Sequence, residues 1–136
     1  MPHLKSLSAS QIRYLLAMKE LGSDGGGIRG ANMASLLGCS KPSVHFMLNT
    51  FRDMGLIQKN AYGCAYFTEA GFAAVDRYNR YYQLVARLLT SYFPPDECLQ
   101  TAIYAFLAEL PEERLQAFCQ EYAAGSAPLQ KAAKAV

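Results

Sequence analysis

The segment Asn32–Leu48 constrains the fold more than any other, because its small and helix-breaking residues are spaced like two helices joined by a tight turn. Gly38 stands where a first helix must end and where the backbone can adopt a left-handed conformation. Ser40 can cap a second helix, and Pro42 fits in that helix's first turn, where a helical N–H partner is not needed. The pattern predicts a helix-turn-helix, the motif that places one helix in the DNA major groove. The alternative is a helical hairpin that serves only packing.

A β-hairpin is predicted directly after this second helix. Gly55 ends the helix, and the apolar pair Leu56–Ile57 begins a short strand. The turn-forming segment Asn60–Gly63 then allows Cys64–Thr68 to return as a second strand. A two-stranded hairpin in this position is the wing of a winged helix. We therefore expect residues 1–71 to form an N-terminal winged helix-turn-helix domain.

The remaining elements are predicted to be helical, so the expected fold class is mostly α. Ser8 and Gln11 form a capping box before a first helix that ends near Gly22, and Ser23–Gly27 is interpreted as a plain linker. Thr68 can cap a long helix from about Glu69 to Tyr92. The apolar residues of this long helix follow a 3-4 spacing, which indicates packing against another helix: Val75, Tyr78, Tyr82, Val85, Leu89 and Tyr92.

Two shorter helices are expected after the break at Pro94–Pro95, one opened by Asp96–Glu97 and one started by Pro111. Residues 72–124 would form a helical dimerisation domain, and residues 125–136 a flexible tail. Residues 72–124 carry more apolar side chains than a segment of this size can bury alone, which predicts a homodimer. The expected interface residues are Val85, Leu88, Leu89, Ile103, Phe106 and Leu107.

Composition and charge favour a compact cytoplasmic regulator. The 136-residue chain is 51% hydrophobic, and none of its apolar runs approaches the ~20 residues needed to cross a membrane. The N-terminal Met1–Ser6 lacks the apolar centre of a secretory signal, and the four cysteines include no C-x-x-C pair, which suits a reducing cytosol. Residues 1–70 carry seven Lys/Arg against four Asp/Glu, whereas residues 71–124 carry four against seven. A basic front half and an acidic rear half fit a DNA-reading head joined to a second module.

Two motifs are the most specific parts of this order of elements: Ser40–x–Pro42–Ser43–Val44 and Gly55–Leu56–Ile57…Phe67–Thr68–x–x–Gly71. Together with the order itself, they resemble the diphtheria-toxin-repressor/manganese-transport-regulator family. The resemblance covers roughly residues 8–120 and is to the short members that lack a C-terminal SH3-like domain. It implies a homodimeric repressor in which divalent iron or manganese locks two DNA-binding heads at operator spacing.

The sequence departs from this family at the metal ligands. The positions at which the resemblance places ligands hold none of His, Asp, Glu or Cys: Ala9 or Ser10, Tyr82, Ala86, Thr101, Tyr104 and Ala105. His3 and His45 are the chain's two histidines, so the rear half has no imidazole for an iron or manganese site. Cys98 with Asp96 and Glu97 is the remaining ligand-like group, but adjacent residues on a helix point in different directions. We therefore expect no metal and no other cofactor.

An effector other than a metal is the alternative means of regulation. Four tyrosines fall where the family keeps its metal: Tyr78, Tyr81, Tyr82 and Tyr104. They would line a pocket for an aromatic or amphipathic ligand, in particular Tyr78, Tyr82 and Tyr104, or else pack as a helix seam. Cys39 and Cys64 raise redox sensing as an alternative, against a role as small buried side chains.

The second helix of the motif and the hairpin supply the expected DNA contacts. Lys41, Ser43 and Arg52 suit phosphates, whereas His45 and Asn49 can address base edges and Phe46 a thymine methyl group. The resemblance also places Ser40, Pro42 and Phe46 at DNA-facing positions, and Lys59 and Tyr62 are expected to contact the DNA backbone from the wing.

The sequence thus predicts a dimeric transcriptional repressor that binds double-stranded DNA and has lost metal sensing. The alternative is a winged-helix adaptor for a protein partner; an enzyme is not expected, because neither histidine can join a Ser-His-Asp or Cys-His constellation.

Overall fold

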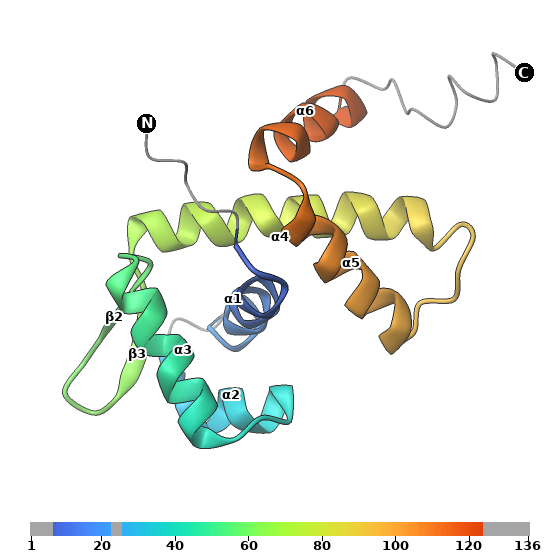
Figure 1. The fold of residues 1–136 in the computed structure, drawn as a ribbon. Coiled ribbons are helices and arrows are strands. Elements are labelled where there is room, and N and C mark those ends of the chain that lie inside the picture. Colours follow the sequence, from blue (N-terminus) through green and yellow to red (C-terminus); the bar gives the residue numbers. More distant parts are fainter. Residues whose placement is uncertain (1–6, 23–25, 124–136) are drawn as a thin grey trace, which may run out of the picture. The chain divides into compact units, whose positions relative to one another are not determined.

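A computed structural model describes residues 7–22 and 26–123 of the chain, and the described part is mostly helical with one small antiparallel sheet (Figure 1). In chain order the elements are α1 (Ala9–Leu21), β1 (Ile28–Arg29), α2 (Gly30–Leu37), α3 (Lys41–Asp53), β2 (Ile57–Lys59), β3 (Cys64–Phe67), α4 (Glu69–Leu89), α5 (Glu97–Glu109) and α6 (Glu112–Ala123). The chain divides into two compact units. We call Ser10–Asn79 the front unit, and residues 80–123 with 7–9 the rear unit; the predicted tail, residues 125–136, lies outside the described residues.

The turn between α2 and α3 forms where the sequence predicts it. Gly38 ends α2 with a left-handed backbone (φ 67°), and the Cys39 N–H donates to the Ala34 carbonyl oxygen over 3.1 Å. Ser40 caps α3, because its hydroxyl oxygen accepts the backbone N–H of Ser43 over 3.2 Å. Pro42 lies in the first turn of α3, as expected.

One face of α3 forms part of the front unit's core. Val44, Leu48 and Phe51 are buried, in agreement with their helical spacing. The core also contains buried apolar side chains from α1 and α2: Ile12, Leu15, Met18 and Met33. The opposite face of α3 therefore remains available to solvent.

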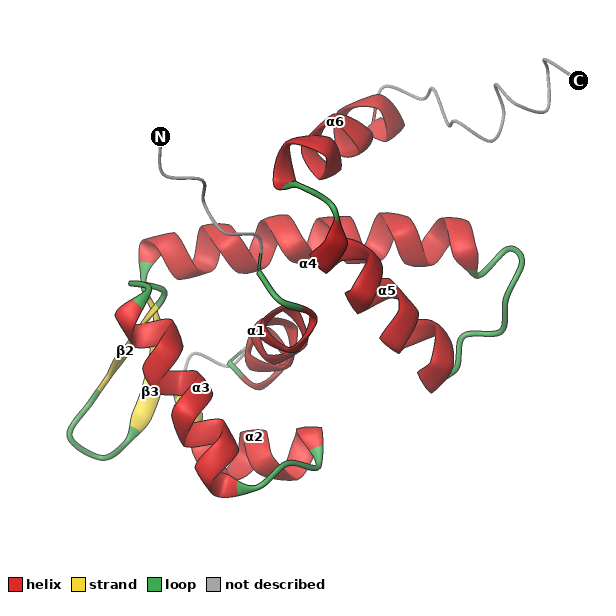
Figure 2. Cartoon of the chain, viewed as in Figure 1, coloured by secondary structure: helices red, strands yellow, loops and turns green. Residues whose placement is uncertain are grey.

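The sheet has three strands, although the sequence predicts two. β2 and β3 form the expected antiparallel hairpin, with Ile57 opposite Phe67, and Figure 2 shows it directly after α3. β1 adds to the other side of β3, with Ile28 opposite Ala65. A two-residue strand carries no periodic signal in the sequence, which explains why β1 was not predicted. The predicted linker Ser23–Gly27 precedes β1, and its residues 23–25 lie outside the described residues.

The hairpin is tied to the start of α4 by a close backbone contact. The Thr68 N–H donates to the Leu56 carbonyl oxygen over 3.0 Å, and the Thr68 hydroxyl donates to the Gly55 carbonyl oxygen over 2.6 Å. That hydroxyl also accepts the Gly71 N–H over 3.1 Å, so Thr68 caps α4 as predicted. A Cβ atom on Gly71 would overlap the Leu56 carbonyl oxygen. The segments Gly55–Leu56 and Thr68–Gly71 therefore form one packed junction that requires glycine at position 71.

The rear unit consists of the second half of α4 with α5 and α6. α4 ends at Leu89, three residues before the predicted end at Tyr92. Pro94 disfavours helical backbone at the residue before it, and residues 90–93 form a turn in which Phe93 N–H bonds to the Leu89 carbonyl oxygen. Tyr92 is consequently exposed rather than part of the helix seam.

The caps and buried faces of α5 and α6 follow the sequence pattern. Asp96 caps α5 by accepting the Leu99 N–H over 3.0 Å, and α6 starts immediately after Pro111. The Tyr81 hydroxyl is buried and donates to Glu112 Oε2 over 2.8 Å, which joins α4 to α6. The buried apolar face of the two helices comprises Leu99, Ile103, Leu107, Leu115 and Cys119. Within the described residues, no helix is both long and apolar enough to cross a membrane.

Candidate nucleic-acid interface

The solvent-facing side of α3 carries most of the predicted DNA contacts. Lys41, His45 and Arg52 are exposed, and Phe46 is 72% exposed. At the 3.6-residue period of a helix, Lys41, His45 and Arg52 align in one exposed strip beside the buried stripe of α3. This strip carries two fixed cations and an imidazole over three helical turns, and Phe46 projects from another side of the same helix.

The N-terminus of α3 is organised by two serines. The Ser40 hydroxyl donates to Ser43 Oγ over 2.9 Å while it accepts the Ser43 N–H. Both side chains are exposed, as is Pro42 beside them. A phosphate approaching this end would meet the positive end of the helix dipole and the ammonium group of Lys41.

The structure changes the expected roles of Asn49 and Lys59. Asn49 was expected to face outward and address base edges, but it is half-buried and its Oδ1 atom accepts a hydrogen bond from Lys59 Nζ over 2.9 Å. Burial, and then the positive charge of Arg52, lower the pKa of Lys59. The hairpin and α3 therefore share one polar cluster of Asn49, Arg52 and Lys59, in which two cations lie near each other. An anion placed between these cations would relieve their repulsion.

The tip of the hairpin presents Tyr62, which is 90% exposed. Its position follows from the Asn60 side chain, whose Oδ1 atom accepts the N–H groups of Tyr62 and Cys64, each over 2.9 Å. Gly63 completes the turn with a φ of 79°. Tyr62 is thus held on a compact turn and is available for contact.

Two residues of α1 position the turn before α3, and the sequence analysis missed both. Arg13 donates from its guanidinium to the Leu37 carbonyl oxygen over 3.3 Å, and the Tyr14 hydroxyl lies 3.3 Å from Cys39 Sγ as its donor. Burial, together with the contact to Cys39, raises the pKa of Tyr14 to about 12. Both contacts join residues more than twenty positions apart in the chain, so no local pattern could have revealed them.

Among the described residues, the cysteines and acidic side chains do not assemble into a larger ligand group. Cys39 is half-buried against Tyr14, Cys64 is buried and Cys98 is exposed; all three are free thiols. Across residues 7–22 and 26–123, no three His, Cys, Asp or Glu side chains come together in a way that could hold a metal ion. Asp96, one of the three residues in the ligand-like group, caps α5. His3 lies outside the described residues.

The predicted dimer residues divide into two groups, which corrects the expected interface. Val85, Ile103 and Leu107 are only 4%, 1% and 0% exposed, because they pack inside their own chain. Ile103 and Leu107 therefore offer no surface to a second copy, whereas Val85 reaches the hollow among α4, α5 and α6. Leu88 and Leu89 are half-buried and Phe106 is 47% exposed, so these residues retain accessible apolar surface.

The predicted tyrosine-lined pocket falls at packed side chains. The rings of Tyr82 and Tyr104 are in contact, with centroids 5.2 Å apart, and burial raises the pKa of Tyr82. Tyr78 is buried and belongs to the front unit. Local aromatic packing therefore accounts for the Tyr82–Tyr104 pair.

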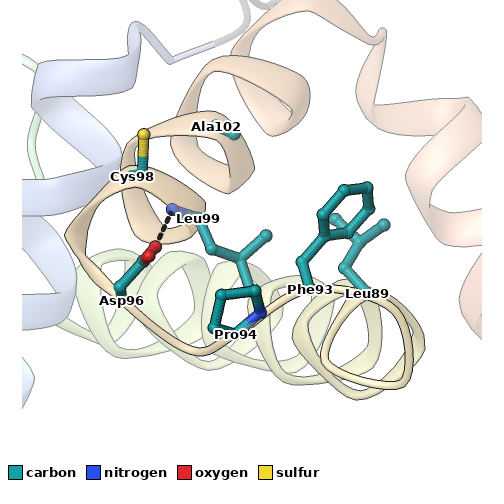
Figure 3. Close-up of a pocket in the computed structure, with 7 residues that line it drawn as sticks. All are labelled: Leu89, Phe93, Pro94, Asp96, Cys98, Leu99 and Ala102. Carbon is teal, nitrogen blue, oxygen red and sulfur yellow. Dashed lines mark hydrogen bonds between the residues drawn. The ribbon is translucent and has the colours of Figure 1, made fainter.

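Two hollows lie elsewhere, lined by described residues of the rear unit. One, of about 320 Å³, is shown in Figure 3, where the Cys98 sulfur points away from Phe93 and Leu89. Its one carboxylate, Asp96, is already bonded to the Leu99 N–H. The second hollow, of about 270 Å³, lies among α4, α5 and α6.

Neither a protein-family model nor a curated protein matches the sequence. Among solved structures, the crystal structure of the hypothetical protein SSo2273 from Sulfolobus solfataricus has a similar fold. The two chains are 21% identical and align with a TM-score of 0.63 over 86% of this chain and 89% of that chain. At this identity the similarity shows the fold alone, and function must be argued from the site.

Proposed function

We propose that the front unit is a winged helix-turn-helix that binds double-stranded DNA, with α3 as the reading helix and the β2–β3 hairpin as the wing. The observation that carries the proposal is an exposed strip of α3, where Lys41, His45 and Arg52 align at helical spacing beside a fully buried apolar face. A helix anchored in this way can enter the major groove without loss of its core packing. The protein would act as a transcriptional regulator, and more specifically as a repressor that blocks its operator.

The cluster of Asn49 and Lys59 suggests how bases would be read. An asparagine usually pairs with adenine by accepting and donating hydrogen bonds at once. Here Asn49 Oδ1 already accepts from Lys59. This bond uses one of the two lone pairs of Oδ1 and leaves the Asn49 N–H groups free to donate to acceptor atoms such as O6 and N7 of guanine. Lys59 is itself a donor and supports the same preference.

A preferred duplex is first selected from a random-sequence pool. Fluorescence anisotropy with that labelled duplex, at several salt concentrations, then tests the DNA contacts. Lys41→Ala and Arg52→Ala should each weaken binding to all sequences and reduce the salt slope by about one unit. His45→Ala should mainly relax sequence preference, at a cost of about 1–3 kcal/mol for the base it contacts. Arg87→Ala is the matched control, since it removes an exposed arginine from the rear unit. Absence of salt-dependent binding to any duplex at low ionic strength would refute the proposal.

A protein-binding adaptor is the second candidate, and one observation favours it. Phe46 exposes 72% of its surface on α3, and Met54 is also exposed near the end of that helix. An apolar ring so exposed is more typical of a protein interface than of a phosphate-binding surface. For a DNA-binding protein, Phe46→Ala should lose discrimination at a thymine. For an adaptor, the same variant should lose a protein partner and leave weak DNA binding unchanged.

We also propose that the protein acts as a homodimer through its rear unit, using the apolar surface of Leu88, Leu89 and Phe106. A dimer would place two reading helices on successive half-sites. Leu88→Glu should yield monomers in analytical ultracentrifugation at tens of micromolar, because it puts a charge in an apolar contact. Gln83→Glu, an exposed change on the same helix, should leave the dimer intact. A monomeric wild type at this concentration would contradict the dimer.

A further inference from the structure

The hollow among α4, α5 and α6 combines an apolar lining with one cation. Its volume is about 270 Å³, close to the lower end of the range for small-molecule sites. The lining side chains are apolar except for one arginine: Val85, Leu88, Leu89, Phe106, Leu110, Arg114, Leu115 and Phe118. The cavity is therefore a hydrocarbon-lined space with a single positive charge.

Arg114 is available to bind an anion. It is exposed, and within residues 7–22 and 26–123 its guanidinium makes no hydrogen bond or ion pair. By contrast, the carboxylate of nearby Glu112 accepts a hydrogen bond from the Tyr81 hydroxyl. Guanidinium groups pair well with carboxylates because two parallel N–H groups match the two oxygens. Arg114 thus has an unused capacity for a carboxylate at the edge of an apolar cavity.

We propose that this cavity binds a medium-chain aliphatic monocarboxylate. The hydrocarbon chain would lie against Leu88, Leu115 and Phe118, and the carboxylate would contact Arg114. The modest volume favours a chain of medium length over a long-chain lipid. The inference concerns the rear unit alone and does not rest on DNA binding.

A second copy of the chain is the rival occupant, because Leu88, Leu89 and Phe106 also belong to the proposed dimer face. In a two-fold contact the same patch faces itself. A contact whose two-fold axis passes beside Arg114 would bring two guanidinium groups together, whereas a contact through the outer surface of Leu88, Leu89 and Phe106 would leave Arg114 to an anion. Charge complementarity accordingly favours a carboxylate inside the cavity. The hollow in Figure 3 has no cationic side chain in its lining, so the same argument does not assign a carboxylate to it.

Isothermal titration calorimetry of the full chain with hexanoate, octanoate and decanoate tests the proposal. Each added methylene should raise the affinity about fourfold until the cavity is full, the factor expected for a buried methylene. Arg114→Gln should weaken octanoate binding about tenfold or more, since it removes the charged partner. The same variant should leave binding of 1-octanol unchanged, which separates loss of charge from loss of folding. Arg87→Gln, another exposed arginine of the rear unit, should change neither ligand's affinity.

Leu110→Trp provides a second test that does not involve charge. The larger side chain should fill the cavity and abolish binding of both octanoate and 1-octanol, while circular dichroism shows a folded chain. Failure of the wild type to bind octanoate at millimolar concentration would overturn the proposal, as would equal binding by Arg114→Gln. Octanoate binding that disappears as the dimer forms across a dilution series would assign the cavity to the second copy, and would overturn it as well.

Discussion

Replacement of Gly71 by alanine should destabilise the front unit, although the same change usually stabilises a helix. Inside a helix, Gly→Ala typically gains about 0.5–1 kcal/mol. At position 71, however, the new Cβ atom would overlap the Leu56 carbonyl oxygen and lie 2.9 Å from its carbonyl carbon. The Leu56 carbonyl cannot simply move away, because its oxygen accepts the Thr68 N–H.

The size of the effect follows from what must shift. Overpacking costs about 1–3 kcal/mol. Displacement of the first turn of α4 also weakens two hydrogen bonds, Thr68 N–H to Leu56 O and Gly71 N–H to Thr68 Oγ1, each worth about 0.5–1.5 kcal/mol. After the helix gain is subtracted, we expect Gly71→Ala to lower the free energy of unfolding by about 2–4 kcal/mol.

Urea denaturation followed by circular dichroism measures this loss. Gly30→Ala is the matched control, because a Cβ atom there would meet Val44 Cγ1 at 3.7 Å and Leu48 Cδ1 at 4.0 Å, both ordinary contacts. It should leave stability unchanged or raise it by up to about 1 kcal/mol. A Gly71→Ala protein as stable as the wild type would refute the argument that this junction requires glycine.

Three further predictions concern single interactions and metal binding. Tyr81→Phe should cost about 1–3 kcal/mol in urea denaturation because it removes the buried hydroxyl's bond to Glu112, whereas Tyr92→Phe, at an exposed position, should cost nothing measurable. Burial raises the pKa of Tyr14 from 10.0 to about 12, so the neutral phenol stabilises the folded state fully below pH 10. This part of the free energy of unfolding should be lost as the pH rises toward 12. A free energy of unfolding that falls as steeply with pH in Tyr14→Phe would contradict this. Calorimetry with Mn²⁺ and Fe²⁺ should reveal no stoichiometric site in the rear unit, and a chelator should leave DNA affinity unchanged; tight one-to-one binding would show that the inferred ligand positions are wrong.

The sequence alone determined the elements whose signals are local. Gly38, Ser40 and Pro42 specify where α2 ends and α3 begins, because backbone conformation and capping depend on a few adjacent residues. The spacing of Val44, Leu48 and Phe51 likewise specified the buried face of α3. The start of α4 at Thr68 and of α5 at Asp96 follow from the same capping chemistry.

Only the tertiary structure decided features that depend on residues far apart in the chain. The pairing of β1 with β3, the contact of Tyr14 with Cys39 and the clash that requires Gly71 each join distant segments, so no sequence window contains both partners. The same reason explains the correction at the predicted dimer face. Periodicity identifies an apolar side chain, but it cannot tell whether its own chain already covers it, as α4–α6 packing does for Val85, Ile103 and Leu107. Asn49 shows this limit at the candidate site, since its Lys59 partner comes from a strand that no helical pattern could place beside it.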